Sequence, residues 1–416
     1  MQEATPLITN DAIVFGILMT VLALVFGTSS SSNPIWKKFY RVVPSILLCY
    51  FIPAVLNSVG LISGEYSGLY SMASRYLLPT SLVLLTLSID FKGILKLGPK
   101  ALVMFLAGSV GIILGGPLAL LTISSIFPEV LGGAGPDEIW RGLATIAGSW
   151  IGGGANQTAM LEVFEASPTL FSQMIAVDVL VANVWMAVLL YWAAKPGTID
   201  KLFKADSSAI HELQDKVEKY REGILKIPTM ADTMKILGIG FALTGLAHLI
   251  ADWLAPFIGE NYPALGQYSL DKTFFWIVVV ATTGGLLLSF TRARELEGAG
   301  ASRLGSVLLY VLVATIGMQM DLMAIFDNPV FFLIGILWMF FHVAIMLLVA
   351  YLIKAPFFFV AVGSQANVGG AASAPIVASA FNPSLAPVGV LMAVLGYAVG
   401  TYGAYICGLL LQLVHG

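Results

Sequence analysis

Long runs of apolar residues, separated by short polar segments, follow one another along almost the whole chain. About ten of these runs approach the 17–25 residues that a helix needs to cross roughly 30 Å of hydrocarbon. The pattern therefore predicts an all-α polytopic membrane protein with about ten transmembrane helices. The predicted spans are 12–28, 43–61, 76–91, 101–126, 170–194, 231–256, 273–290, 304–320, 329–353 and 385–413.

Two further apolar segments, 140–164 and 357–381, are interrupted at their centres by small and polar residues. The two segments resemble each other, because glycine, hydroxyl and proline positions recur at a constant offset. We interpret this register as an internal duplication. The matched pairs are Gly148 with Gly363, Ser149 with Ser364, Gly154 with Gly369, Thr158 with Ser373, Ala159 with Ala374, and Pro168 with Pro383.

The similarity extends upstream, where the turn at Asp90 resembles the turn at Asp321. A polar stretch, 195–229, separates the two halves, so the predicted organisation is a first repeat 1–194, a linker and a second repeat 230–416. Within the linker, apolar residues at alternating steps of three and four share one helical face. They predict a connector helix at the membrane surface and are Ile210, Leu213, Val217, Tyr220 and Ile224.

The distribution of basic residues indicates how the halves face, since Lys and Arg accumulate in cytoplasmic loops. Suppose that the N-terminus lies outside and that both interrupted segments are hairpins that return to the side they entered from. All of the 21 basic residues except Arg75, Arg141 and Lys272 then lie inside. A full crossing by 140–164 would destroy this bias. We therefore expect inverted repeats in a multi-pass protein of the cell (inner) membrane, with the linker cytoplasmic and both hairpin tips near the bilayer midplane.

Breaks at matching points of inverted repeats are typical of a transporter's binding site. Helix N-termini at such tips present free N–H groups to an anion, and unwound carbonyls suit Na⁺. The alternative, that the small residues only permit close helix packing, stays open. The candidate solute-binding residues are Ser149, Gly152, Gly153, Gly154, Asn156, Gln157, Thr158, Ser364, Gln365, Asn367, Gly369, Gly370 and Ser373.

Ionisable residues inside spans are costly and tend to be functional. Asp178 lies deep in 170–194 and is the leading candidate for a coupling-ion site, together with Asn156, Asn367 and Ser373. The other polar residues of the spans have blander interpretations. We expect an interhelical hydrogen bond at His342 and structural roles in turns for Asp90 and Asp321. Arg141 could attract anions or pair with Asp137 or Glu138. Three tyrosines could line a pathway or simply pack: Tyr397, Tyr402 and Tyr405.

Composition narrows the class of protein. Charged residues make up 11% of the chain, less than half of the roughly 25% usual in soluble proteins. The net charge of −3 gives no reason to expect a nucleic-acid partner. Cys49 and Cys407 lie in apolar runs and predict neither a disulfide nor a metal site. The spans lack paired Ser/Lys or Asp/Asp residues and a His-Glu-x-x-His signature, so we expect no enzyme activity and no cofactor other than a coupling ion.

The first hairpin sequence, Ile146-Ala-Gly-Ser-Trp-Ile-Gly-Gly-Gly-Ala-Asn-Gln157, and the overall layout resemble the YjcL-like family of bacterial and plastid membrane proteins. More distantly, the plan is similar to the glutamate:sodium and citrate:sodium symporters. That resemblance implies a homodimer in which the hairpins and their partner spans move, elevator-fashion, against a scaffold made of the early spans of each half.

Taken together, the sequence predicts a cation-coupled (Na⁺ or H⁺) secondary active transporter, by symport or antiport, of a small polar, anionic organic solute. The first alternative is a cation/proton antiporter without an organic substrate, in which Asp178 matters most. A membrane scaffold or receptor is the third possibility, although it has no need of two glycine-rich breaks at matching points.

Overall fold

The computed structural model describes residues 6–40, 43–203, 205, 227–320, 328–382 and 385–416. These residues form helices and turns, and no strand occurs among them. The longer helices are α1 (Asp11–Ser29), α3 (Ser45–Ser58), α5 (Leu78–Leu87), α7 (Pro99–Ile126), α8 (Ile139–Gly152), α9 (Gly154–Phe164), α10 (Pro168–Ala193), α13 (Met230–Asn261), α14 (Thr273–Ser289), α15 (Ala301–Gly317), α16 (Val330–Ile353), α17 (Phe357–Val368), α18 (Gly370–Phe381) and α19 (Ala386–His415). The shorter ones are α2 (Pro34–Tyr40), α4 (Leu69–Met72), α6 (Phe91–Lys96), α11 (Pro196–Phe203), the π-helical turn η1 (Ala73–Leu77) and the 3₁₀ turns η2 (Pro128–Leu131), η3 (Gly135–Asp137), η4 (Pro263–Tyr268) and η5 (Arg292–Ala299).

Each predicted apolar run coincides with a helix, but fewer than ten of them qualify as complete spans. Among the described residues, 6 helices are long and apolar enough to cross a membrane, or up to 8 if each bent helix pair counts as one span. This count rests on length and composition alone, and the expected total of about ten crossings stays a prediction. The run at 76–91 falls in η1 and α5, which continue α4 without a break over 69–87, and α15 has 17 residues.

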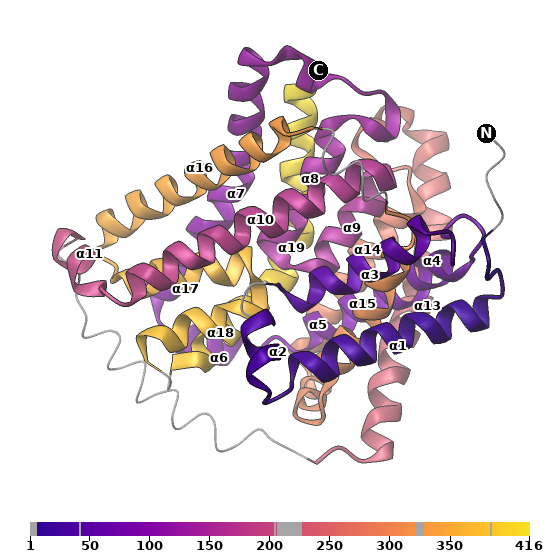
Figure 1. The fold of residues 1–416 in the computed structure, drawn as a ribbon, viewed down its shortest axis with the longest axis horizontal. Helices are drawn as coiled ribbons and strands as arrows, with labels where there is room; N and C mark the ends of the chain where they lie inside the picture. The colour runs from indigo at the N-terminus through magenta and orange to yellow at the C-terminus, as the bar shows by residue number, and fades with distance from the viewer. Residues whose placement is uncertain (1–5, 41–42, 204, 206–226, 321–327, 383–384) are drawn as a thin grey trace.

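The two interrupted segments form the helix pairs that the sequence predicts. α8 and α9 cover 139–164 and pack against each other, and α17 and α18 do the same over 357–381. Figure 1 shows α17 and α18 side by side. Their entry from opposite faces of the membrane, and hence the inversion of the repeats, stays a prediction.

The helices pack into two groups. In the first group, α5 packs against α13, α14 and α15, and α3 packs against α1 and α15. In the second group, α7 packs against α16 and α17, and α19 packs against α8 and α18. The two groups meet where α5 and α14 contact α9 and α19. Each group combines helices from both halves of the chain: the early helices of each half form the first, and the hairpins with α7, α10, α16 and α19 form the second.

Four glycines on α7, Gly108, Gly111, Gly115 and Gly116, let α16 approach closely. A Cβ added to Gly116 would lie 2.6 Å from Trp338 Cζ2, and one added to Gly111 would lie 3.1 Å from the Cα of His342. Trp338 also donates its indole N–H to the carbonyl of Ile112 at 2.8 Å. Since no side chain larger than hydrogen fits there, α7 and α16 form one rigid pair.

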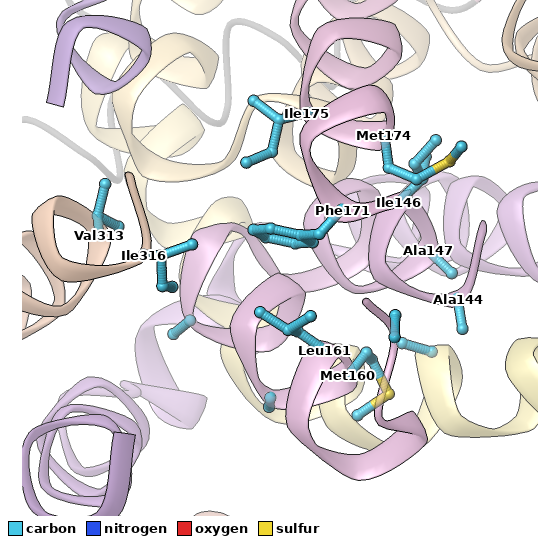
Figure 2. Close-up of a cluster of buried hydrophobic side chains, with 14 of the residues drawn as sticks. Ala144, Ile146, Ala147, Met160, Leu161, Phe171, Met174, Ile175, Val313 and Ile316 are labelled. Carbon is cyan, nitrogen blue, oxygen red and sulfur yellow. The ribbon is translucent and has the colours of Figure 1, made fainter. Parts of the chain in front are cut away.

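An apolar cluster joins the first hairpin to α10 and reaches the other helix group (Figure 2). Phe171 of α10 is fully buried in this cluster, which also includes Val313 and Ile316 of α15. The contact between the groups in this region is therefore made by apolar side chains rather than by ion pairs. Figure 2 labels Ala144, Ile146, Ala147, Met160, Leu161, Phe171, Met174, Ile175, Val313 and Ile316.

The linker and two of the predicted turns can be placed only in part. Of 195–229, the structure describes α11 and the few residues beside it, so the predicted amphipathic face from Ile210 to Ile224 lies outside the described residues, as do Asp321 and Pro383. Asp90 forms an ion pair with Arg294 of η5 just before α6 begins. This pairing agrees with the structural role predicted for Asp90.

Candidate functional site

Each hairpin turns at glycines that adopt backbone angles unfavourable for other residues. Gly153, between α8 and α9, has a φ of 75°, and Gly370, the first residue of α18, has a φ of 58°. An L-residue with a Cβ meets steric resistance in this region of backbone space. The glycine-rich sequences therefore place a new helix N-terminus at each tip: Gly154 begins α9 and Gly370 begins α18.

Both tips face a single cavity of about 580 Å³. The first hairpin contributes Gly153, Gly154 and the neighbouring side chains, and the second contributes Gly369, Gly370 and theirs. The sequence prediction that the two breaks share one site agrees with this geometry. The polar side chains on the wall are Ser29, Tyr40, Ser45, Tyr50, Ser149, Gln157, Asp178, Asn183, Ser306, Tyr310, Gln365, Ser373 and Tyr397.

The electrostatics of the cavity combine one carboxylate with two helix N-termini. The first N–H groups of α9 and α18 have no acceptor within their own helices, and each N-terminus carries a partial positive charge. Asp178 of α10 is the one formally charged side chain on the described wall, where Lys, Arg and His are absent. A small solute in this cavity therefore meets the positive backbone ends of both tips together with one negative side chain.

Asp178 accepts three hydrogen bonds from the first hairpin. Oδ2 accepts from Ser149 Oγ at 2.6 Å and from Gln157 Nε2 at 3.1 Å, and Oδ1 accepts from Trp150 Nε1 at 2.7 Å. Asp178 is 8% exposed, so most of its solvation comes from these donors. The carboxylate thereby fixes the tip of the first hairpin to α10.

The second tip has different polar chemistry. Gln365 Nε2 donates to Ser373 Oγ at 2.7 Å, across the break between α17 and α18. Gln365 Oε1 is buried with no hydrogen-bond partner among the described residues. Buried polar atoms are rarely left unsatisfied, and one beside a cavity is a common feature of a site that receives a ligand.

Five predicted site residues lie off the cavity wall. Asn156 Nδ2 donates to the carbonyl of Gly152 at 3.0 Å, and its Oδ1 accepts from Thr401 of α19 at 2.5 Å. Asn367 Nδ2 donates to the carbonyls of Phe105 and Gly363, both at 2.9 Å, and its Oδ1 accepts from Ser109 of α7 at 2.7 Å. The hydrogen bonds of both amides thus run to nearby backbone carbonyls and to hydroxyls of α19 and α7. The residues off the wall are Gly152, Asn156, Thr158, Ser364 and Asn367.

Ser364 belongs to a separate buried network. Its Oγ accepts from Trp185 Nε1 of α10 at 2.8 Å and lies 2.8 Å from His342 Nε2 of α16. His342 Nδ1 lies 3.0 Å from the carbonyl of Gly108. A carbonyl can only accept, so Nδ1 carries the proton and Nε2 accepts from Ser364. His342 therefore makes the interhelical hydrogen bonds that the sequence predicts, tying α16 to α7 and α17.

At the open end of the first hairpin, Arg141 pairs with Glu138, one of the two partners predicted for it. Arg141 Nε lies 3.0 Å from Glu138 Oε2, and its Nη1 donates to the carbonyl of Phe164 at 2.6 Å. Burial raises the pKa of Glu138, but donation by Trp140 and Arg141 outweighs this effect and holds the pKa below its usual value. Arg141 thus ties the two arms of the hairpin together.

Comparison with known proteins places this architecture in a family. The model of the family described as "Protein of unknown function (DUF819)" matches residues 16–414, a range that includes both hairpins and α10. The chain belongs to this family. It is also 26% identical over 379 residues to the uncharacterized membrane protein YjcL of Bacillus subtilis (strain 168), covering 88% of this chain and 89% of that protein. The chain is thus a multi-pass membrane protein of an uncharacterised family, consistent with the cell membrane.

Several residues of this family member's site were not anticipated from the sequence. Trp150 binds Asp178 although it reads as an ordinary apolar residue beside Ser149. Tyr50 and Tyr310 line the cavity from α3 and α15, in the other helix group. Trp150 lies between Ser149 and Gln157 in the glycine-rich segment 149–157, which is a signal that could have indicated it. The two tyrosines carry no local signal, because only packing of distant helices brings them to the tips.

Proposed function

We propose that this protein is a cation-coupled secondary active transporter of a small polar, anionic organic solute. The observation that carries the proposal is the cavity of about 580 Å³ shared by the tips of α8–α9 and α17–α18. Irregular backbone at membrane depth is tolerated only where protein or a water-filled cavity satisfies it. Two such breaks facing one cavity form the arrangement expected of a transporter's binding site.

In this proposal, the anionic group of the solute binds to the N-termini of α9 and α18. The amides near Gly154 and Gly370 are its donors, and the flexible glycines allow the solute to approach the backbone. Gln157, Gln365 and Ser373 add side-chain hydrogen bonds from both tips. The volume suits a small organic molecule, since ligand cavities usually measure about 300–1,000 Å³.

The coupling cation binds at Asp178, which offsets the repulsion between its carboxylate and an anionic solute. Loading of the solute then depends on loading of the cation, and this dependence couples the two fluxes. Ser373, which lies across the cavity, is a secondary candidate for this site. Asn156 and Asn367 act in the proposal as supports that hold the tips in place.

Alternating access takes place by movement of the second helix group against the first. The division into two groups supports this mechanism, as does the apolar cluster between Phe171 and Ile316, which offers little resistance to sliding. The polar contacts between the groups are few enough to exchange. They include Tyr70 with Glu162 and Lys272 with Glu165, the latter at 3.2 Å. Dimerisation through the first group and an outside N-terminus complete the proposal.

The test is uptake by proteoliposomes under an imposed gradient. The purified protein is reconstituted, and radiolabelled small carboxylates are offered with an inward Na⁺ gradient, an inward H⁺ gradient, or neither. The proposal predicts accumulation that requires a gradient and is abolished by Asp178→Asn. Asp252→Asn, at an exposed position of α13, is the matched control and keeps uptake. Absence of accumulation under both gradients for the whole carboxylate series contradicts the proposal.

A second candidate, a cation/proton antiporter without organic substrate, is favoured by one observation. The only charged side chain on the described cavity wall is the carboxylate Asp178, which attracts cations. Dye-quench assays on inside-out vesicles separate the two functions, because an antiporter dissipates a preset pH gradient when Na⁺ or K⁺ is added without any carboxylate.

A further inference from the structure

The partners of Asp178 restrict which cation can bind there. All three groups that contact the carboxylate donate hydrogen bonds to it, and two of them are N–H groups, Trp150 Nε1 and Gln157 Nε2. Metal cations such as Na⁺ or Ca²⁺ are held by several oxygen ligands. The hydrogens of Trp150 and Gln157 instead point toward the oxygens that a metal ion would share. The groups that contact the Asp178 carboxylate therefore offer few oxygen ligands to a metal cation.

A proton needs only one lone pair, and the remaining partner can adapt to it. Ser149 Oγ lies 2.6 Å from Asp178 Oδ2. A serine hydroxyl donates one hydrogen bond and accepts up to two, and within a helix it often donates to the carbonyl four residues earlier. When a proton joins Oδ2, Ser149 can accept from the new carboxyl O–H and turn its own hydrogen to the carbonyl of Thr145.

We propose that the coupling ion of this transporter is H⁺, bound by Asp178, and that Ser149 is the positioning residue that accommodates both protonation states. The inference rests on the proposed function for its meaning, but it concerns the ion alone. Protonation converts the carboxylate into a neutral carboxyl group. The cavity then keeps its two positive helix N-termini without an opposing negative charge, and an anionic solute binds better.

The other titratable groups near Asp178 leave this assignment unchanged. Of the helices packed against α10, α8 carries Arg141 at its far end, paired with Glu138, and α16 carries His342, engaged with Gly108 and Ser364. α17 and α18 carry no titratable side chain. Four tyrosines, Tyr40, Tyr50, Tyr310 and Tyr397, also line the cavity, and as phenols they are neutral.

The repeat supplies a matched control for Ser149. Ser364 occupies the same position in the second half of the chain, yet it binds His342 and Trp185 rather than Asp178. Removing either hydroxyl makes the same chemical change at the same point of a hairpin. Only the loss of Ser149 should alter the proton affinity of Asp178.

Infrared difference spectroscopy on a film of proteoliposomes tests the proposal without a solute. Lowering the pH in KCl should bring up the C=O stretching band of a protonated carboxyl, which Asp178→Asn removes and Asp252→Asn keeps. Replacing KCl by NaCl at constant pH should leave this band unchanged. A carboxylate band that responds to Na⁺ and disappears in Asp178→Asn overturns the proposal, as does a pH-dependent band that Asp178→Asn leaves intact.

The same experiment tests Ser149. Loss of its hydrogen bond to the charged carboxylate should tighten proton binding about tenfold, which moves the midpoint of the band in Ser149→Ala upward by about one pH unit. Ser149→Thr and Ser364→Ala should keep the wild-type midpoint. Equal midpoints in all three variants contradict the role of Ser149. Failure of gradient-driven uptake with these spectra as expected would instead contradict the transport proposal.

Discussion

Thr401 of α19 donates a hydrogen bond to Asn156 Oδ1 of α9 at 2.5 Å, with both residues buried. The hydroxyl of Thr401 also lies 3.2 Å from that of Thr282 on α14, in the other helix group. This short chain of contacts joins the tip of the first hairpin, the last helix and the boundary between the groups. Asn156 therefore acts through the packing of the tip.

The first prediction concerns the hydrogen bond between Thr401 and Asn156. Asn156→Ala leaves the Thr401 hydroxyl without its acceptor in a buried place, which should destabilise the fold by about 1–3 kcal/mol. Asn183→Ala is the control, since among the described residues Asn183 bonds within its own helix, to the carbonyl of Val179 at 2.7 Å. Denaturation midpoints of the two variants in the same detergent measure the difference. Equal midpoints would show that the Thr401 contact contributes nothing.

The second prediction concerns the turn at Gly153, where φ is 75° and ψ is −175°. This combination is almost exclusive to glycine, so Gly153→Ala should cost about 1–3 kcal/mol through backbone strain alone. An added Cβ meets nothing within 4 Å there, which excludes a steric clash. Gly238→Ala in α13 also adds a Cβ in open space, but at a helical position, where it should be neutral or stabilising. Thermal unfolding of both variants provides the measurement, and a neutral Gly153→Ala would refute the strain.

The third prediction concerns the boundary between the helix groups. The Tyr70 hydroxyl of α4 donates to Glu162 of α9 beside a second cavity of about 520 Å³, which Ala166 also lines. Removal of this bond in Tyr70→Phe should favour separation of the groups, by about two- to tenfold from the usual energy of one hydrogen bond.

The measurement is the labelling rate of a cysteine placed at Ala166 by a membrane-impermeant maleimide. Tyr66→Phe, at an exposed tyrosine that makes no hydrogen bond among the described residues, provides the baseline. Identical labelling rates in the two backgrounds would mean that Tyr70 does not hold the groups together.

The hairpins were predictable from sequence because their signals are local. Glycine-rich interruptions within 140–164 and 357–381 mark the starts of α9 and α18 closely, since glycine tolerates the angles at Gly153 and Gly370 far better than other residues. The depth of Asp178 in a long apolar run likewise indicates a special role. Such features depend on a few neighbouring residues, which a single sequence displays in full.

The features that the sequence does not display depend on packing between distant helices. Asn156 and Asn367 resemble solute ligands in the sequence because they lie near glycines. In the structure, hydroxyl groups on α19 and α7 donate hydrogen bonds to their amide oxygens. The sequence does not display those helices as neighbours. The length of individual helices also depends on packing, because α5 and α15 are covered by neighbouring helices.

The fourth prediction concerns Gln365, which faces the cavity from the second tip. Gln365→Met keeps the length of the side chain but removes its polar atoms, and it should lower solute affinity by about tenfold, the usual effect of one lost hydrogen bond in a buried site. Gln412→Met, near the end of α19 and off the cavity wall, is the matched control. Saturation curves of uptake for both variants provide the comparison, and an unchanged KM in Gln365→Met would remove Gln365 from the solute site.

The most direct measurement of the central claim is site-directed cross-linking of the two tips in the presence and absence of solute. Cysteines at Ala155 and Ala371, which both line the shared cavity, are joined by a short bifunctional maleimide in membranes. If the cavity binds the solute, the cross-link should form readily, abolish uptake and be slowed by a transported carboxylate. Failure of the two positions to cross-link, or full uptake by the cross-linked protein, would contradict the account.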